Sequence, residues 1–337
     1  MNALAAANSS PRPAVSVKGL VKRYDEVEAV RGIDFEVAGG EIFGFLGPNG
    51  AGKSTTINML CTLVRPSAGS ALVAGHDVVG ERDEVRRNIG LVFQDTTLDG
   101  YLSAEQNLRL HAELYGVPRD AVDERMRQVM EIVGLWERRG SLVNTFSGGM
   151  KRRLEIARGL LHSPRVLFLD EPTVGLDPQT RSSIWRYIRE LKSQEDITIF
   201  LTTHYMDEAE YCDRIAIMDQ GRIIVLDTPQ ALKAKVGKDR VQIQTEDDQA
   251  AIAALRERFG LEATVAEGAV TFGVPEGEHF VPRLFAELGL PIGSVSVARP
   301  SLDDVFMSYT GSTIRDRESM GGDRDGMRQM ARMMGRH

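Results

Sequence analysis

Cysteines and long hydrophobic runs are scarce in this sequence. Its 337 residues include only two cysteines, Cys61 and Cys212, which are far apart and lack metal-ligand spacing. We therefore expect neither a disulfide framework nor a zinc site, and we predict that both are small buried hydrophobic residues in a reducing compartment. No run of about 18 apolar residues, the length of a membrane helix, occurs, since Ile42–Leu46 stops at Gly-Pro and Ile57–Val64 stops at Arg-Pro. Any membrane role would require another chain.

An excess of positive charge is also absent. Lys and Arg number 41 against 48 acidic residues, a net charge of -7. This balance argues against nucleic-acid binding by bulk charge, although a local basic patch remains open. Residues 1–13 lack the basic segment and the apolar length of a signal peptide, so we expect no export. The composition, 42% hydrophobic and 26% charged, excludes collagen-like, low-complexity and wholly disordered chains.

Length and hydrophobic pattern predict two domains, one large and one small, at about 150 residues per domain. Short apolar runs alternate with amphipathic helices over residues 15–232, which predicts an α/β domain with a mainly parallel sheet. Helical periodicity without a strand from Ser103 to Gly134 predicts an inserted helical subdomain at about residues 95–160. The strongest predicted strands are Glu41–Leu46, Ile89–Phe93, Val166–Asp170, Thr198–Thr202 and Arg214–Met218.

A different pattern begins after Gly237 and predicts a small ferredoxin-like α+β domain over residues 238–310, in the order β-α-β-β-α-β. Its predicted strands are Val241–Gln244, Ala263–Val265, Val270–Gly273 and Ser294–Ala298, and its predicted helices are Asp248–Phe259 and His279–Leu288. Residues 1–14 are predicted to be a flexible arm and residues 311–337 a mobile tail. Methionine and arginine spacing in the tail leaves docking on a partner or on lipid headgroups open beside disorder.

One segment fits the pattern of a phosphate-binding loop between a predicted strand and a predicted helix. The loop consists of Gly47, Pro48, Asn49, Gly50, Ala51, Gly52, Lys53 and Ser54, followed by Thr55. Its glycines allow a tight turn in which several N–H groups and a helix N-terminus face one polyphosphate. Lys53 is expected to contact the β- and γ-phosphates, and the Ser54 hydroxyl to bind Mg²⁺. The alternative is a glycine-rich turn that matches by chance.

Two acidic residues follow the apolar strand Val166–Leu169. Because neighbouring residues in a strand point to opposite sides, Asp170 can face Mg²⁺ while Glu171 faces an attacking water. The alternative is that both acids only cap the sheet.

A second glycine pair begins another predicted helix. Ser147 is placed to cap the helix that follows Gly148 and Gly149. Its first turn, Lys151–Arg153, places three cations at the positive end of the helix dipole, which predicts a bound anion. A capped helix with a solvated basic turn is the alternative.

These motifs, in this order, resemble the nucleotide-binding subunits of ATP-binding cassette (ABC) transporters over about residues 15–230. The resemblance implies a P-loop NTPase fold of the ABC type. The segments Phe146–Leu154 and Arg299–Phe306 look most like the daunorubicin/doxorubicin drug-resistance exporter type. Phe146 and Met150 stand where Leu and Gln are common in the family; Met150 supplies no amide, which leaves Ser147 and backbone N–H groups to hold phosphate.

The resemblance also implies roles for single residues. Tyr24 would stack on adenine, Gln94 would reach Mg²⁺ and the attacking water, Asp177 would act across a dimer, and His204 would contact the γ-phosphate. The alternatives without a role in nucleotide binding are, in the same order, a sheet-packing tyrosine, a solvated loop amide, an N-cap before Pro178, and a structural histidine.

Taken together, the resemblance implies an ATPase that uses ATP and Mg²⁺. Two subunits, predicted to be a homodimer, would enclose two ATP molecules, with Lys53 of one copy and Ser147 of the other on each. A separate transmembrane permease would hold the chain at the cytoplasmic face of the cell membrane, near Gln94 and the helical insertion, for export of a drug or hydrophobic metabolite. No nucleic-acid partner is expected. The alternatives are a soluble ABC ATPase acting on nucleic acid or the ribosome, and an importer subunit.

Overall fold

The computed structural model describes residues 13–194, 197–266 and 268–310. The chain divides into two units, which meet in sequence between Thr228 and Pro229. The predicted mobile tail, and all but residues 13–14 of the predicted N-terminal arm, lie outside the described residues.

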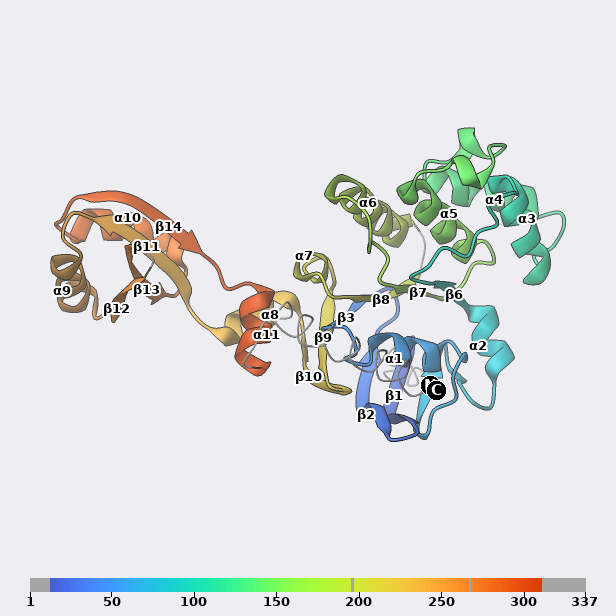
Figure 1. The fold of residues 1–337 in the computed structure, drawn as a ribbon, viewed down its shortest axis with the longest axis horizontal. Helices are drawn as coiled ribbons and strands as arrows, with labels where there is room; N and C mark the ends of the chain where they lie inside the picture. Colours follow the sequence, from blue (N-terminus) through green and yellow to red (C-terminus); the bar gives the residue numbers. More distant parts are fainter. Residues whose placement is uncertain (1–12, 195–196, 267, 311–337) are drawn as a thin grey trace, which may run out of the picture. The chain divides into compact units, whose positions relative to one another are not determined.

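A six-stranded sheet forms the centre of the first unit (Figure 1), in the order β10-β9-β3-β8-β7-β6. Its strands are β3 (Ile42–Leu46), β6 (Ile89–Val92), β7 (Val166–Asp170), β8 (Thr198–Thr203), β9 (Arg214–Asp219) and β10 (Arg222–Asp227). All neighbouring pairs are parallel except the hairpin of β9 and β10. The five predicted strands are therefore confirmed, to within two residues at each end. Packed rings of Phe35, Phe43, Phe45 and Phe200 lie in the core beneath β3 and β8.

A second sheet in this unit is antiparallel, which the prediction of one mainly parallel sheet did not include. Its order is β2-β1-β4-β5, formed by β1 (Val15–Tyr24), β2 (Val27–Val37), β4 (Ala68–Val73) and β5 (His76–Asp77). Buried and exposed residues alternate at the ends of β1 and β2 that pair with each other. One face of this sheet is therefore buried and the other is exposed, as antiparallel sheets allow.

The helices of the first unit are α1 (Lys53–Leu60), α2 (Arg82–Asn88), α3 (Ala104–Leu114), α4 (Val122–Ile132), α5 (Gly148–Leu160), α6 (Pro178–Gln194) and α7 (Met206–Ala209). Short 3-10 turns lie at Trp136–Arg138 and Val143–Thr145. Figure 1 shows α3, α4 and α5 gathered on one side of the six-stranded sheet, with α1 and the antiparallel sheet on the other. A capping box, formed by Ser103 and Gln106, begins α3. No strand interrupts Ala104–Ile132, as the helical periodicity predicted.

The second unit has the predicted ferredoxin-like order. Its elements are α8 (Pro229–Val236), β11 (Asp239–Thr245), α9 (Asp248–Phe259), β12 (Ala263–Ala266), β13 (Ala269–Val274), α10 (Gly277–Glu287), β14 (Ile292–Ala298) and α11 (Leu302–Thr310). The antiparallel sheet β12-β13-β11-β14 packs its apolar face on α9 and α10. Because α8 contacts α11, the unit begins at Pro229, a few residues before the predicted end of the large domain at residue 232.

Both cysteines are buried, as predicted. Burial raises the pKa of each thiol above its ordinary value, because the thiolate would lose its hydration.

Candidate active site

The phosphate-loop pattern forms a tight turn between β3 and α1. A side chain on Gly47 would place its Cβ 2.1 Å from the carbonyl oxygen of Met218, and one on Gly52 would lie 2.5 Å from that of Ala29. Gly52 also has a φ of 106°, in the region that favours glycine. The Ala51 carbonyl accepts the Gly221 N–H at 2.9 Å, which ties the loop to the β9–β10 hairpin. The glycines therefore let the loop lie directly against neighbouring backbone.

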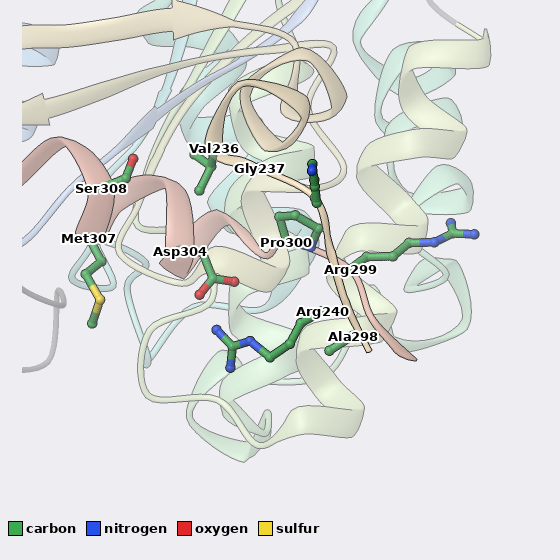
Figure 2. Close-up of a pocket in the computed structure, with 10 residues that line it drawn as sticks. Val236, Gly237, Arg240, Ala298, Arg299, Pro300, Asp304, Met307 and Ser308 are labelled. Atoms are coloured by element: carbon green, nitrogen blue, oxygen red, sulfur yellow. The ribbon is translucent and has the colours of Figure 1, made fainter. Parts of the chain in front are cut away.

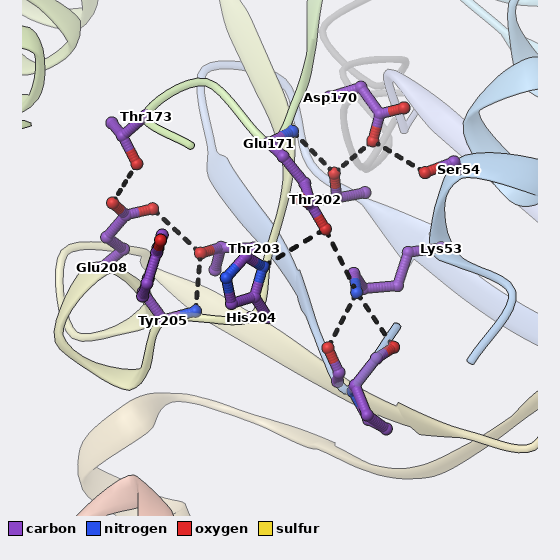
Figure 3. A network of polar contacts seen from close by, with 12 residues as sticks. Lys53, Ser54, Asp170, Glu171, Thr173, Thr202, Thr203, His204, Tyr205 and Glu208 are labelled. Atoms are coloured by element: carbon purple, nitrogen blue, oxygen red, sulfur yellow. Dashed lines mark hydrogen bonds and ion pairs between the residues drawn. The ribbon is translucent and has the colours of Figure 1, made fainter. Parts of the chain in front are cut away.

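Lys53 is folded back over this loop. Its Nζ donates to the carbonyl oxygens of Gly47 at 2.8 Å and Pro48 at 3.1 Å. The same Nζ lies 3.5 Å from Glu171 Oε1 (Figure 3), and both side chains are buried. The loop thus holds a cation at its centre, next to a carboxylate from the end of β7.

Asp170 is held by hydroxyl groups from two other elements. Ser54 Oγ donates to its Oδ1 at 3.1 Å, and Thr202 Oγ1 donates to the same atom at 2.5 Å. The first of these contacts joins residues 116 positions apart. Carboxylate and hydroxyl oxygens are hard donors that suit Mg²⁺, which usually keeps several waters and needs few protein ligands. The donor set of Ser54 and Asp170 therefore fits the predicted ion.

Glu171 differs from the expectation in its backbone. The strand ends at Asp170, and Glu171 has a φ of 46°, so the argument from alternation within a strand was wrong for this residue. Its N–H donates to Thr202 Oγ1 at 3.0 Å, which anchors the turn. In this turn, Glu171 Oε1 lies 3.4 Å from His204 Nδ1 and 3.5 Å from Lys53 Nζ.

The charge of Glu171 follows from these neighbours. Burial raises the pKa of this carboxyl, but the nearby His204 and Lys53 outweigh burial and hold the pKa below its ordinary value. The group is therefore an anion at neutral pH, able to accept a hydrogen bond from a water molecule.

Several residues of this cluster were not found by sequence reasoning. Thr202, Thr203, Thr173 and Glu208 are all buried and hydrogen-bonded around Asp170, Glu171 and His204. The available signal was the pair of threonines that ends the apolar strand Ile197–Leu201.

The second glycine motif forms the start of α5. Ser147 Oγ accepts the Met150 N–H at 3.3 Å and caps the helix. Ser147 and Gly148 are exposed, whereas a Cβ on Gly149 would lie 2.4 Å from Thr180 Cγ2. We call Lys53, Asp170, Glu171 and His204 the Lys53 cluster. Among the described residues, no contact joins Ser147 to this cluster in the same chain.

The basic turn after this motif needs no external anion at two of its three positions. Arg152 is buried, pairs with Glu155 Oε2 at 3.2 Å, and donates to the carbonyl oxygens of Pro172 at 2.6 Å, Asp170 at 3.1 Å and Phe93. Arg153 donates to the Val133 carbonyl and to the Tyr187 hydroxyl. The inference of a bound anion from these cations was therefore wrong for both arginines, because internal acceptors compensate them.

The other predicted site residues lie at the surface. Gln94 is exposed in the segment after β6, and no contact among the described residues joins it to the Lys53 cluster. Tyr24 is 43% exposed at the end of β1, with Lys22 Nζ 4.7 Å from its ring centroid. Asp177 accepts the Thr180 N–H at 3.0 Å and its hydroxyl at 2.6 Å, contacts that lower the pKa of Asp177. Asp177 thus makes the contacts of an N-cap before Pro178, which was the structural alternative for this residue.

The second unit contains a cavity of about 310 Å³ between the ends of α8 and β14 and helix α11 (Figure 2). Lys238, Arg240 and Arg299 contribute positive charge. Figure 2 shows Arg299 and Arg240 pointing apart. Arg299 pairs with Glu278 at 2.7 Å. The charges do not converge, so this cavity lacks the geometry of an anion site.

Comparisons with known proteins agree with this geometry. Residues 30–174 match the family described as ABC transporter, and residues 228–310 match the ATP-binding protein DrrA1-3-like, C-terminal domain. The chain is 40% identical over 321 residues to the daunorubicin/doxorubicin resistance ATP-binding protein DrrA of Streptomyces peucetius, covering 93% of this chain and 97% of the relative. It is 37% identical over 311 residues to the linearmycin resistance ATP-binding protein LnrL of Bacillus subtilis (strain 168), covering 90% and 100%.

The fold is similar to solved cassettes. A dimeric structure of MJ0796, a bacterial ABC transporter cassette, superposes with a TM-score of 0.58 at 26% identity, covering 64% of this chain and 98% of the cassette. Within the described residues, no helix has both the length and the apolar character needed to span a membrane.

Proposed function

Because the chain belongs to the ATP-binding subunits of ABC transporters, of the daunorubicin/doxorubicin-resistance type, we propose that it drives export of a drug or hydrophobic metabolite through a separate transmembrane permease. The subunit binds and hydrolyses ATP, as its family does. The DrrA-like match of residues 228–310 favours export over the importer and nucleic-acid alternatives. The single observation that carries the mechanism is the cluster of Lys53, Asp170, Glu171 and His204 at one edge of the sheet.

Nucleotide binding would use the loop Gly47–Ser54 and the first turn of α1, including Thr55. Lys53 Nζ now donates to two carbonyl oxygens of its own loop, and the stronger acceptors on the β- and γ-phosphates would take these donors over. Backbone N–H groups of the loop would hold the remaining phosphate oxygens. Tyr24, with its exposed ring, would stack on the adenine.

Mg²⁺ fits the oxygens of Ser54 and Asp170, with Gln94 as a further ligand from the segment after β6. When bound there, the ion would offset the negative charge of the phosphates. Thr202, which bonds Asp170 from the neighbouring strand, would orient this carboxylate.

Hydrolysis would place a water beside Glu171. The oxygen of this water attacks the γ-phosphorus, the bond from that phosphorus to the β–γ bridging oxygen breaks, and the carboxylate of Glu171 accepts the water proton. Lys53 and His204 lie on either side of the same carboxylate oxygen, so both can stabilise charge on the transferred group.

Two copies would complete each site. Ser147 and Gly148 are exposed at the N-terminus of α5 and make no contact with the Lys53 cluster of their own chain among the described residues. A helix N-terminus that starts with exposed donors suits the γ-phosphate of an ATP held by a partner copy. Asp177, also exposed, would act across the same interface while capping α6.

The permease would dock near Gln94 and α3, and so hold the chain at the cytoplasmic face of the cell membrane. Large apolar side chains are exposed in both segments, among them Phe93 after β6, Tyr101 at 88% exposure and Leu114 at 74%. Apolar side chains that gather into one exposed patch are typical of surfaces that bind another protein.

The test is Glu171→Gln in the full chain. The variant should bind ATP and form an ATP-dependent dimer, while phosphate release falls by a factor of about 100 or more, because an amide cannot take the proton from water. Phosphate release and light scattering with ATP measure the two properties. Asp207→Asn, at an exposed position, is the matched control and should leave both unchanged. Hydrolysis at the wild-type rate in Glu171→Gln would remove Glu171 from the mechanism.

A further inference from the structure

Glu208 is a buried carboxylate that the mechanism above does not use. It lies in α7, four residues after His204, and its side chain is about 3% exposed. Two hydroxyls donate to it, Thr173 to Oε1 and Thr203 to Oε2, the second at 2.9 Å. Both threonines are buried as well. Burying a carboxylate costs several kcal/mol of folding free energy unless such donors compensate it. We therefore ask what Glu208 does at this position.

The two threonines belong to the two segments that carry the reacting groups. Thr173 lies two residues after Glu171, and Thr203 directly precedes His204. Thr203 Oγ1 also accepts the Tyr205 N–H at 3.0 Å, so the backbone is held on both sides of His204. Figure 3 shows the Glu208 carboxylate between the end of β8 and the segment after β7.

A third segment reaches the same carboxylate. Arg181 of α6 lies with its Nε 3.7 Å from Glu208 Oε1, and its guanidinium is 4.2 Å from the ring centroid of Tyr205. The negative charge of Glu208 therefore has a cation beside it, and the same guanidinium packs on the ring of Tyr205, the residue after His204.

We propose that Glu208 is a positioning residue for ATP hydrolysis, which ties Thr173 to Thr203 and thereby fixes His204 beside Glu171. The bridge closes a ring that runs from Glu171 to Thr173, through Glu208 to Thr203, and from His204 back to Glu171 across 3.4 Å. Displacements near 1 Å at reacting groups cost up to about 100-fold in rate. The inference rests on the proposed roles of Glu171 and His204.

The test compares two substitutions at Glu208 in the full chain. Glu208→Ala removes the bridge, and we expect kcat for ATP hydrolysis to fall about 10- to 100-fold while KM and the Kd for ATP stay within about threefold. Glu208→Gln keeps it, because the amide accepts from one hydroxyl and donates to the other, so kcat should stay within about threefold of wild type. Asp207→Ala, on the same helix but exposed, is the matched control.

The threonines supply an independent test should Glu208→Ala fail to fold. Thr173→Val and Thr203→Val keep the shape of the side chain and remove one hydroxyl each. Each should lower kcat, and the double variant Thr173→Val with Thr203→Val should lower it no further than the larger single loss, because both hydroxyls act through one bridge. Where Glu208→Ala folds, neither threonine substitution should lower kcat further in that background.

Three results would overturn the proposal. They are a wild-type kcat in folded Glu208→Ala, a loss in Glu208→Gln as large as in Glu208→Ala, and additive losses among the three positions. Glu171→Gln, assayed in parallel, separates the two proposals. If that variant is inactive and Glu208→Ala is fully active, only the positioning role fails, whereas an active Glu171→Gln removes the mechanism itself.

Discussion

Glu171 shows how a single residue in this site is held under strain. A non-glycine residue with a φ of 46° costs about 1–2 kcal/mol relative to an ordinary backbone. Thr202 offsets this cost, because its hydroxyl accepts the Glu171 N–H while donating to Asp170. The carboxylate on this turn lies beside Lys53 and His204, and we predict that the strained turn is needed for the proposed hydrolysis.

Thr202→Val should therefore weaken both stability and turnover. The substitution leaves the buried N–H of Glu171 and one bond of Asp170 unsatisfied, so we expect the thermal midpoint of the first unit to fall by about 2–8 °C. We also expect kcat to fall more than ATP affinity does, since the Glu171 turn loses its anchor. Calorimetry and phosphate release measure these effects. Thr202→Ser keeps the hydroxyl and should restore both, and equal losses in the two variants would contradict this account.

At this scale the sequence predicted Lys53, Ser54, Asp170, Glu171 and His204 as candidates, and the structure brings all five together. It could not predict Thr202. The role of that hydroxyl depends on the register in which Asp170 pairs with Thr202 between β7 and β8, and strand order and register are tertiary facts. Glu208 was missed for the same reason, because its partners lie in two segments that meet only after folding.

Among the elements, α5 is bound tightly to the sheet by one buried ion pair. Arg152 donates to backbone carbonyls of Phe93, Asp170 and Pro172, and Glu155 Oε1 accepts the Thr97 N–H at 2.8 Å. The helix that Ser147 caps is thereby joined to the end of β7 and to the segment that carries Gln94. A shift in either segment would move the start of α5.

Arg152→Leu should destabilise the first unit more than the double substitution Arg152→Leu with Glu155→Leu. The single change leaves the buried side chain of Glu155, 1% exposed, without its Arg152 partner, whereas the double change removes both members of the pair. We expect a coupling of about 1–3 kcal/mol in a double-mutant cycle of unfolding. The cycle is measured by denaturant unfolding of the full chain. Additive losses would show that the pair is not energetically coupled.

The elements also show where pattern reasoning reaches its limit. Continuous apolar runs predicted β3, β7 and β8 because strands buried on both faces carry that signal. The antiparallel sheet of β1, β2, β4 and β5 escaped, since its exposed face interrupts the runs with polar residues such as Lys18 and Glu36. The basic turn at Arg152 was misread because the carbonyl oxygens that compensate it come from other segments.

For the whole molecule, the proposed site takes Lys53 from one copy and Ser147 from the other. Ser147 is exposed, and the only hydrogen bond of its side chain among the described residues is the one that caps α5. A site within one chain and a site across two copies predict different activities for mixed dimers. Two variants suit this comparison. Lys53→Ala removes the phosphate-binding cation, and Ser147→Asp keeps a favoured N-cap residue while placing an anion against the phosphate.

Mixing the Lys53→Ala chain with the Ser147→Asp chain should restore hydrolysis. In a site built across two copies, the mixed dimer holds one site in which both Lys53 and Ser147 are intact. At equal amounts, random pairing makes half of the dimers mixed, so about a quarter of wild-type phosphate release is expected if the two sites act independently. A chain carrying both substitutions, mixed with wild type, has no intact site in the mixed dimer. Wild-type pairs still make up a quarter of the dimers in that second mixture, so sites built across two copies predict about a quarter of wild-type release in both mixtures. No release in the first mixture and about half of wild-type release in the second would show instead that each site lies within a single chain, because only then does the wild-type copy keep a complete site in the mixed dimer.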